Sequence, residues 1–260
     1  MKKFIKDLKR YNSYIWYTAW AELKVEIINS YLGWLWLVLE PLAFMFIYMF
    51  IAEVVFKTKV DYFPIFVFIG LTAWTFFNKM VVTSVKLIAA NKETITKVYL
   101  PKFVLLLIKL LVNIFKMVIS FALVIVFMII YKVPVTWNVL WFFPIVIALI
   151  VFTFGVCTIM MHFGVFAEDL VNIALRMLFY MTGIFYDIST KIHNVVYRTL
   201  LLEFNPLANI IFNLRNVLIY QKSIVGMWTF LWLLVGILLS ILGIRLIYKY
   251  ENTYVKVMKS

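Results

Sequence analysis

Few ionisable side chains in this sequence have the types and spacing that catalysis requires. The one adjacent acidic pair, Glu168 and Asp169, could act as general acid and base only in a pocket that shifts its pKa values. A solvated charge pair in a loop is the simpler interpretation. His162 and His193 lie in separate segments, so a two-histidine metal site is not expected. The sequence therefore indicates no catalytic residues and no metal site.

Glu40 is the one acidic residue expected inside a membrane-spanning stretch, and it directly precedes Pro41. Charged groups within a membrane are costly, so they usually face protein or water. Proline can also free a backbone carbonyl and bend a helix. We interpret Glu40 first as a packing or gating contact and only second as a contact to a substrate.

Aromatic residues make up 19% of the chain. Many are expected at membrane interfaces. Rings inside the predicted spans could stack on sugar faces, and their polar groups could bond sugar hydroxyls. From composition alone, packing against lipid or other helices is the favoured alternative. The candidates for lining a substrate path are Tyr31, Trp34, Trp36, Tyr48, Phe179, Tyr180 and Tyr186.

The elements that carry these residues are predicted to be membrane helices. The chain is 65% hydrophobic and 14% charged, more apolar than a soluble domain can hide. Six stretches approach the ~20 apolar residues that cross a bilayer. They lie near 31–52, 64–85, 103–131, 141–162, 171–187 and 224–247. We therefore predict an all-α polytopic membrane protein, with a six-span domain over 31–247 between a segment 1–30 and a tail 248–260.

The distribution of Lys and Arg predicts the orientation. The segments 1–30, 79–102, 163–170 and 245–260 together hold 15 Lys and Arg, whereas 53–63, 132–140 and 188–223 hold 7. Positive residues are enriched in cytoplasmic loops. Both termini are therefore expected in the cytoplasm of a bacterial cell, with the protein in the inner membrane. The net charge of +13 is assigned to contacts with anionic lipids and not with nucleic acid.

Three further segments are expected to lie outside the spans. Residues 2–16 show the spacing of an amphipathic helix on the membrane surface. Residues 86–100 are periodic but polar, which predicts a short cytoplasmic helix that ends before Pro101. The segment 188–223 holds two apolar pieces, separated by Asn205-Pro206 and each too short to cross. These pieces are typical of paired helices that dip into the outer leaflet and return.

The order of these parts resembles the membrane subunit of type-2 ABC exporters for O-antigen, capsule and wall teichoic acid. The resemblance covers nearly the whole chain. It rests on the basic start, on Ile28–Trp36 leading to Glu40-Pro41, on Asn91 through Leu100-Pro101, and on Asn205-Pro206 before Arg215. Two loops depart from the family pattern, Glu168-Asp169 in place of Arg-Asp and Thr182–Tyr186 in place of Ser-Pro and an aromatic.

The resemblance implies a homodimer bound to two cytoplasmic ABC ATPase subunits, with the conduit along the dimer axis. It implies that 86–100 is the coupling helix and that 188–223 forms the outer gate. Residues expected to couple to the ATPase are Asn91, Lys92, Glu93, Ile95, Lys97 and Pro101. The gating candidates are Glu40, Asn205, Pro206 and Arg215. The implied substrate is a glycan linked to polyprenyl pyrophosphate, or a teichoic acid.

Nucleotide chemistry is expected on the partner. The sequence has no Gly-x-x-x-x-Gly-Lys-Ser/Thr loop to cradle phosphates, so ATP and Mg²⁺ are assigned to the ATPase and no cofactor to this chain. One alternative keeps the exporter class and changes the cargo to a drug, an antibiotic or a lipid. Another is a membrane-embedded glycosyltransferase or acyltransferase. That enzyme would need acidic or histidine residues converging at one membrane depth, a pattern that the sequence does not show.

Overall fold

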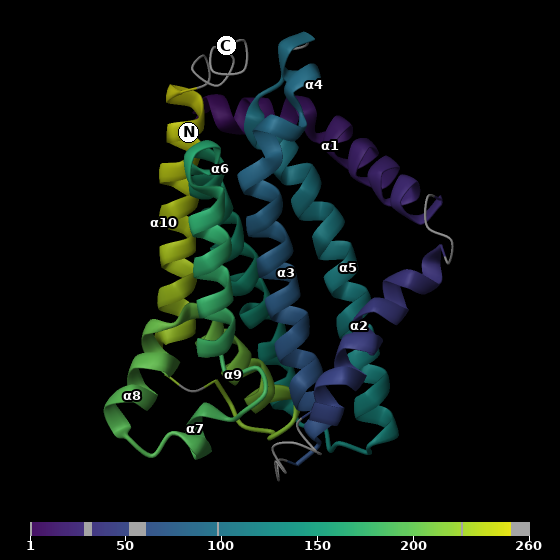
Figure 1. Cartoon of the computed structure of the whole chain (residues 1–260), viewed down its shortest axis with the longest axis vertical. Helices are drawn as coiled ribbons and strands as arrows, with labels where there is room; N and C mark the ends of the chain where they lie inside the picture. The colour runs from purple at the N-terminus through teal and green to yellow at the C-terminus, as the bar shows by residue number, and fades with distance from the viewer. Residues whose placement is uncertain (1, 29–32, 52–60, 98, 225, 251–260) are drawn as a thin grey trace.

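The protein is all-α throughout the residues that its computed structural model describes, which are 2–28, 33–51, 61–97, 99–224 and 226–250. The elements, in chain order, are α1 (Lys2–Ile28), α2 (Trp34–Phe50), α3 (Phe63–Ala90), α4 (Lys92–Lys97), α5 (Lys102–Ile130), the 3₁₀ turn η2 (Trp137–Trp141), α6 (Phe142–Met181), α7 (Ile188–Lys191), α8 (Val195–Thr199), the π-helical turn η3 (Leu200–Phe204), α9 (Pro206–Leu218) and α10 (Trp228–Lys249). Figure 1 shows α4 and the end of α10 at one end of the bundle, here called the α4 end, and α7 and α8 at the other, here called the α7 end.

Four helical stretches in the described residues are long and apolar enough to cross a membrane: Phe63–Ala90, Lys102–Ile130, Trp137–His162 and Trp228–Lys249. They cover four of the six predicted stretches, so the protein is a multi-pass membrane protein. The first predicted stretch contains α2, whose 17 residues rise about 26 Å. A span count of six therefore stays a prediction.

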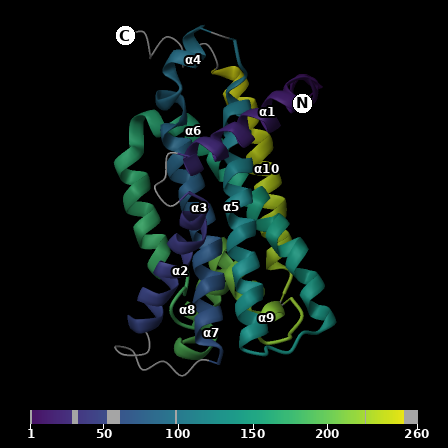
Figure 2. The same cartoon turned by 90° about the vertical axis from the view of Figure 1, so that its right-hand side faces the viewer.

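Helix α6 joins two predicted spans and corrects the loop predicted at 163–170. Its backbone is helical from Phe142 to Met181. Yet Phe152 stacks on Phe77 with ring centroids 6.3 Å apart, and Phe179 lies 5.2 Å from Trp74. Trp74 and Phe77 are one turn apart on α3, whereas a straight helix would separate 152 from 179 by about 40 Å. The backbone of α6 therefore reverses direction, and two arms cover the same part of α3 (Figure 2).

The absence of proline explains why the segment stays helical. Residues 163–170 contain none, so nothing removes a backbone donor there. The fifth predicted stretch ends early instead, because α6 stops at Met181 and Gly183 follows with φ +66°. Only glycine adopts this left-handed region without strain. The predicted fifth span, 171–187, is thus six residues shorter at its end.

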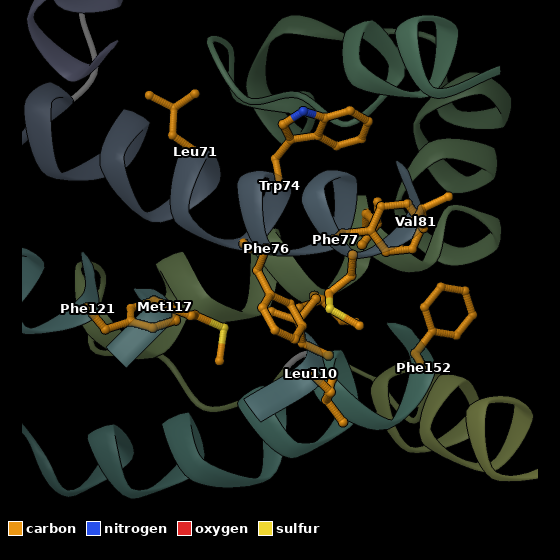
Figure 3. Packing of buried hydrophobic residues seen from close by; sticks show 14 of the residues in the cluster. Leu71, Trp74, Phe76, Phe77, Val81, Leu110, Met117, Phe121 and Phe152 are labelled. Atoms are coloured by element: carbon orange, nitrogen blue, oxygen red, sulfur yellow. The ribbon is translucent and has the colours of Figure 1, made fainter. Parts of the chain in front are cut away.

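Helix α3 is the centre of the bundle. Almost every residue from Phe63 to Phe77 is buried. Figure 3 shows Phe76 pointing toward Leu110 and Met117 of α5, while Phe77 faces Phe152 of α6. The outer helices keep apolar side chains on their exposed faces, which lipid can solvate as well as protein can. This arrangement explains why α3 and not α10 carries most of the core.

The first arm of α6 packs against α10 through small residues. A Cβ atom added to Gly236 would lie 2.7 Å from the backbone of Phe152, and one added to Gly155 would lie 2.5 Å from the carbonyl oxygen of Gly236. Thr158 Oγ1 donates to Gly155 O at 2.7 Å within this contact. Small residues let membrane helices approach until their backbones touch. We call this contact the α6–α10 seam.

Helix α1 is longer than the amphipathic helix predicted over 2–16. It runs to Ile28 and packs on α5 with Ile15, Ala19 and Leu23 buried. Ile5, near the start of the same helix, is exposed. The reason is that one stripe of α1 contacts protein while the remaining apolar side chains point away from the bundle. Tyr248 Oη donates to Asp7 at 2.7 Å, which holds the start of α1 to the end of α10.

Candidate functional sites

The α4 end carries a short helix held by one apolar side chain. The segment predicted as a single helix over 86–100 is divided, because residues 86–90 complete α3 and Asn91 ends it. Asn91 Nδ2 donates to Leu87 O at 2.8 Å, and this local side-chain bond competes with continuation of the helix. Helix α4 then buries Ile95 and exposes Lys92 and Glu93. Its polar face is free to contact another protein.

Interactions between nearby residues stabilise the two ends of α4. Glu93 lies in its first turn and Lys97 in its last, the placement that favours a helix dipole. These two side chains lie 3.9 Å apart and are mostly exposed, so their pairing contributes little. Pro101 is buried and directly precedes α5, whereas α4 already ends at Lys97, four residues before the proline. The coupling role of α4 is a matter for the proposal below.

Three lysines of the central helices pair with glutamates of α1 and α2. Lys79 Nζ of α3 lies 2.8 Å from Glu40 Oε1 of α2, and Lys109 Nζ of α5 lies 2.8 Å from Glu22 Oε2 of α1. Lys116 of α5 pairs with Glu26 of α1. The six side chains are 25–49% exposed, so water screens them in part. We call these contacts the ion-pair ladder; it ties α1 and α2 to α3 and α5.

Sequence reasoning singled out Glu40 but missed its partner and the two other pairs. The sequence does contain a signal for the two pairs that involve α1. Glu22 and Glu26 are four residues apart, and Lys109 and Lys116 are seven apart, so each pair shares a helix face. The spacing identifies the faces but not the helices that meet.

A pocket with both charged and apolar lining residues lies beside the ladder, between α2, α3 and α5. Glu40, Lys79, Asn113 and Lys116 line it, and so does Thr72, whose buried hydroxyl has no hydrogen-bond partner among the described residues. An adjoining pocket shares the two lysines and Asn113 and extends to α1. Charged groups at such a depth between apolar helices mark functional sites more often than packing sites. Here they can hold the α1–α2 side of the bundle against its centre, and release it when the pairs separate.

At the α7 end, the predicted break at Asn205-Pro206 is present. Asn205 Oδ1 accepts from the backbone N–H groups of Leu207 and Ala208 at 3.1 and 3.2 Å, which caps α9. Pro206 occupies the first turn, where its missing N–H costs nothing. Asn205 Nδ2 also donates to Met181 O at 3.3 Å. Asn205 therefore fixes both the start of α9 and its place against the end of α6.

Arg215 locks α9 into the bundle. Its side chain is 4% exposed. Nε donates to Phe66 O at 3.1 Å, and the two terminal nitrogens donate to Gly183 O at 2.8 Å and Ile184 O at 2.7 Å. The guanidinium also lies 3.4 Å from the centroid of the Phe66 ring. The gating candidate Arg215 thus joins α9 to α3 and to the turn after α6.

The aromatic candidates fall into two groups. Phe179 packs 5.5 Å from the ring of Phe185, while Tyr186 Oη donates to Tyr180 O at 2.9 Å. Tyr180 is 72% exposed and Trp36 of α2 is 50% exposed, and no ring contact in the described residues joins them. Tyr31 and the side chains of Trp34 and Tyr48 lie outside the described residues. The structure brings together Phe179, Tyr180 and Tyr186 alone.

The ionisable residues that sequence analysis set aside lie on the surface. Glu168 pairs with Lys86 at 2.7 Å, with both side chains about half exposed, as a solvated acidic residue would. His162 packs 4.8 Å from the ring of Tyr250 at the α4 end, whereas His193 is exposed beyond α7. Within the described residues, no group of three His, Cys, Asp or Glu side chains converges as a metal site.

The all-α membrane bundle, with a short polar helix at one end and a capped hairpin at the other, defines the class as a polytopic membrane protein. No protein-family model matches the chain. It is 30% identical over 213 residues to the O-antigen export system permease protein RfbA of Myxococcus xanthus, covering 81% of this chain and 82% of that protein. It is 27% identical over 244 residues to the protein of the same name from Klebsiella pneumoniae, covering 91% and 92%. The chain belongs to the family of O-antigen export permeases, the membrane components of type-2 ABC transporters.

Proposed function

We propose that this chain is the transmembrane subunit of an ATP-driven exporter that moves a lipid-linked polysaccharide from the cytoplasm across the inner membrane. The observation that carries the proposal is its similarity to O-antigen export permeases over more than four-fifths of its length. The names of these relatives favour O-antigen over capsule or teichoic acid as the cargo.

The proposed assembly is a homodimer of this chain bound to two cytoplasmic ABC ATPase subunits, which bind ATP and Mg²⁺. The α4 end then faces the cytoplasm, where the exposed face of α4 docks on the ATPase. Ile95 is buried in the permease, so a push on α4 reaches the bundle through that side chain. Both termini lie on the same side, and α1 rests on the anionic inner leaflet.

In this proposal α2 and the second arm of α6 complete six spans. Helix α2 is short for a ~30 Å hydrocarbon core, so a span would need about three further residues from its flanks. The exposed rings of Trp36 and Tyr180 would then face the conduit at the dimer axis. The Arg215-anchored hairpin lies on the outside and forms the outer gate.

Deletion in the host tests the function. Cells without the chain are expected to lose the surface polysaccharide and to accumulate its lipid-linked form in the cytoplasmic leaflet. The wild-type gene should restore export, and a partner ATPase without catalytic activity should reproduce the deletion. Unchanged surface polysaccharide, with raised sensitivity to an antibiotic, would instead favour the exporter of a small cargo.

Labelling tests the topology. Trp137 in η2 is 87% exposed at the α7 end, and Lys92 is exposed on α4. In spheroplasts, a membrane-impermeant maleimide should label Trp137→Cys and spare Lys92→Cys until the membrane is permeabilised. Labelling of Lys92→Cys from outside would overturn the orientation.

A further inference from the structure

A second polar pocket lies at the α7 end, away from the ion-pair ladder. Its volume of about 550 Å³ lies within the ~300–1,000 Å³ typical of small-molecule sites. It forms where the start of α3, the segment around α7 and the end of α9 meet. The lining residues are Asp61, Asp187, Ser189, Thr190, Lys191, His193, Phe212, Asn216, Tyr220 and Lys222.

One buried donor in this pocket has no partner. The Asn216 side chain is 3% exposed, and its Nδ2 makes no hydrogen bond in the described structure. Buried amides are almost always paired, because leaving one unpaired forfeits its bond to water. The backbone of Asn216 is satisfied, since its carbonyl accepts from Lys222 N at 2.9 Å. Asn216 therefore places an unpaired, desolvated amide in the wall of the pocket.

The charges of the lining balance and favour neither a cation nor an anion. Asp61 and Asp187 are opposed by Lys191 and Lys222, so a cation or an anion would meet charges of its own sign. Asp187 Oδ1 accepts from Ser189 N and Oγ at 2.9 and 2.7 Å, which fixes the carboxylate in place. Carboxylates accept from hydroxyls, while ammonium and amide groups donate to them. A compound with many hydroxyl groups can donate to the carboxylates and accept from the ammonium and amide groups.

Two aromatic side chains also line this pocket. Phe212 and Tyr220 are half-buried in the lining and present rings beside the polar groups. Burial, and then the nearby charge of Asp187, raises the pKa of Tyr220 to about 12. Its hydroxyl therefore stays protonated at physiological pH and can donate. Rings beside paired donors and acceptors suit the apolar faces and hydroxyl edges of a sugar.

We propose that this pocket binds a sugar unit of the exported polymer on the outer face of the membrane, an assignment that rests on the proposed export function. Asn216 directly follows Arg215, and both belong to α9. A sugar bound at Asn216 thus contacts the same helix that Arg215 fastens to α3. The pocket holds the emerging chain beside the outer hairpin and hinders its return.

A thiol in the pocket tests the proposal in the full-length protein within its exporter. Cys157 is the only cysteine of the chain and is buried, so an introduced thiol is the one that reacts. Thr190→Cys places it in the pocket, and Val196→Cys, at a position 64% exposed on α8, serves as the matched control. Spheroplasts are labelled with impermeant maleimide in two backgrounds. One exports the polymer through an active ATPase, and the other makes no polymer.

Thr190→Cys should lose most of its labelling while the polymer is being exported, whereas Val196→Cys should label equally in both backgrounds. Adding Asp61→Asn and Tyr220→Phe, which keep shape, should restore labelling of Thr190→Cys. Equal labelling at 190 in both backgrounds, protection of both positions, or protection that survives the two substitutions would each overturn the sugar site. The proposed sugar site would also be overturned if maleimide labelled Thr190→Cys in neither background.

The surface polymer of the parent strain separates the two hypotheses. If the amount of surface polymer does not change when this chain is removed, the proposed export function is wrong. If export depends on the chain but position 190 is never protected, the pocket assignment alone fails.

Discussion

Lys79 of α3 and Glu40 of α2 lie 2.8 Å apart, directly beside Pro41. The pair joins a short helix to the most buried helix of the bundle. Both side chains are about one-third exposed, so the contact is neither a fully buried ion pair nor a surface one. Together with the two pairs of α1, it adds an electrostatic attachment to the packing of α1 and α2 on the bundle.

We predict that this attachment weakens with salt. A double-mutant cycle of Glu40→Gln and Lys79→Met should give a coupling of ~0.2–1 kcal/mol in thermal unfolding at low ionic strength, shrinking as NaCl is raised. The control pair is Glu93 and Lys97, whose coupling should be near zero because both side chains are mostly exposed. A coupling for Glu40 and Lys79 that does not change with salt would contradict the screened geometry.

Arg215 is predicted to require its guanidinium and not only its charge. Arg215→Lys cannot reach the carbonyls of Phe66, Gly183 and Ile184 together, so at least one acceptor loses its bond. Stability should fall by about 2 kcal/mol or more, measured as thermal unfolding in detergent, and export should fall with it. Arg198→Lys on α8, which lacks such a network, is the control and should stay near wild type. Normal stability of Arg215→Lys would refute the locking role.

Deletion of Glu93–Thr96 is predicted to uncouple the two subunits. The deletion removes most of α4, including the buried Ile95, while the spans flanking it keep their own contacts. ATP hydrolysis by the complex should continue and surface polysaccharide should be lost, with the permease at normal abundance. Thr96→Ala removes only local bonds to Lys92 O and Glu93 O and should leave export intact. Continued export after the deletion would assign coupling to another segment.

The aromatic path is tested by a triple substitution. Trp34→Leu, Tyr48→Leu and Tyr186→Leu together should reduce surface polysaccharide strongly at normal protein abundance. Each single substitution should have a modest effect, since sugar contacts to rings are weak and interchangeable, on the order of 0.5–1.5 kcal/mol if aromatic pairs are a guide. Phe143→Leu, on the exposed face of α6, is the control for lost lipid contact. Full export by the triple variant would contradict the proposed sugar path and would indicate that these rings only pack against lipid or other helices.

The sequence predicted best the features that depend on neighbouring residues. The apolar runs located α3, α5, the first arm of α6 and α10, because bilayer thickness sets the length of a span. Asn205-Pro206 predicted the start of α9, because a cap and a first-turn proline act within three residues. The same local reasoning placed a helix boundary at Pro101, which directly precedes α5.

Features that depend on distant contacts were not predictable in this way. Glu22 and Lys109 are 87 positions apart, and no local pattern states which faces meet. The sugar pocket collects residues from three segments for the same reason. The helical path through 163–170 was missed because polar residues suggested a loop, although the segment has no proline to end a helix.

The α6–α10 seam bears on how the chain is made. Thr158 and Leu239, which meet across it, are 81 positions apart, and α10 is the last helix of the described chain. During synthesis, the groove of α6 beside Gly155 enters the bilayer before its partner α10 leaves the ribosome. Lipid must fill that groove until α10 is inserted and displaces it. Assembly in the membrane is therefore completed by the final helix, and a chain that stalls before Trp228 presents an unfinished surface for a membrane protease to recognise.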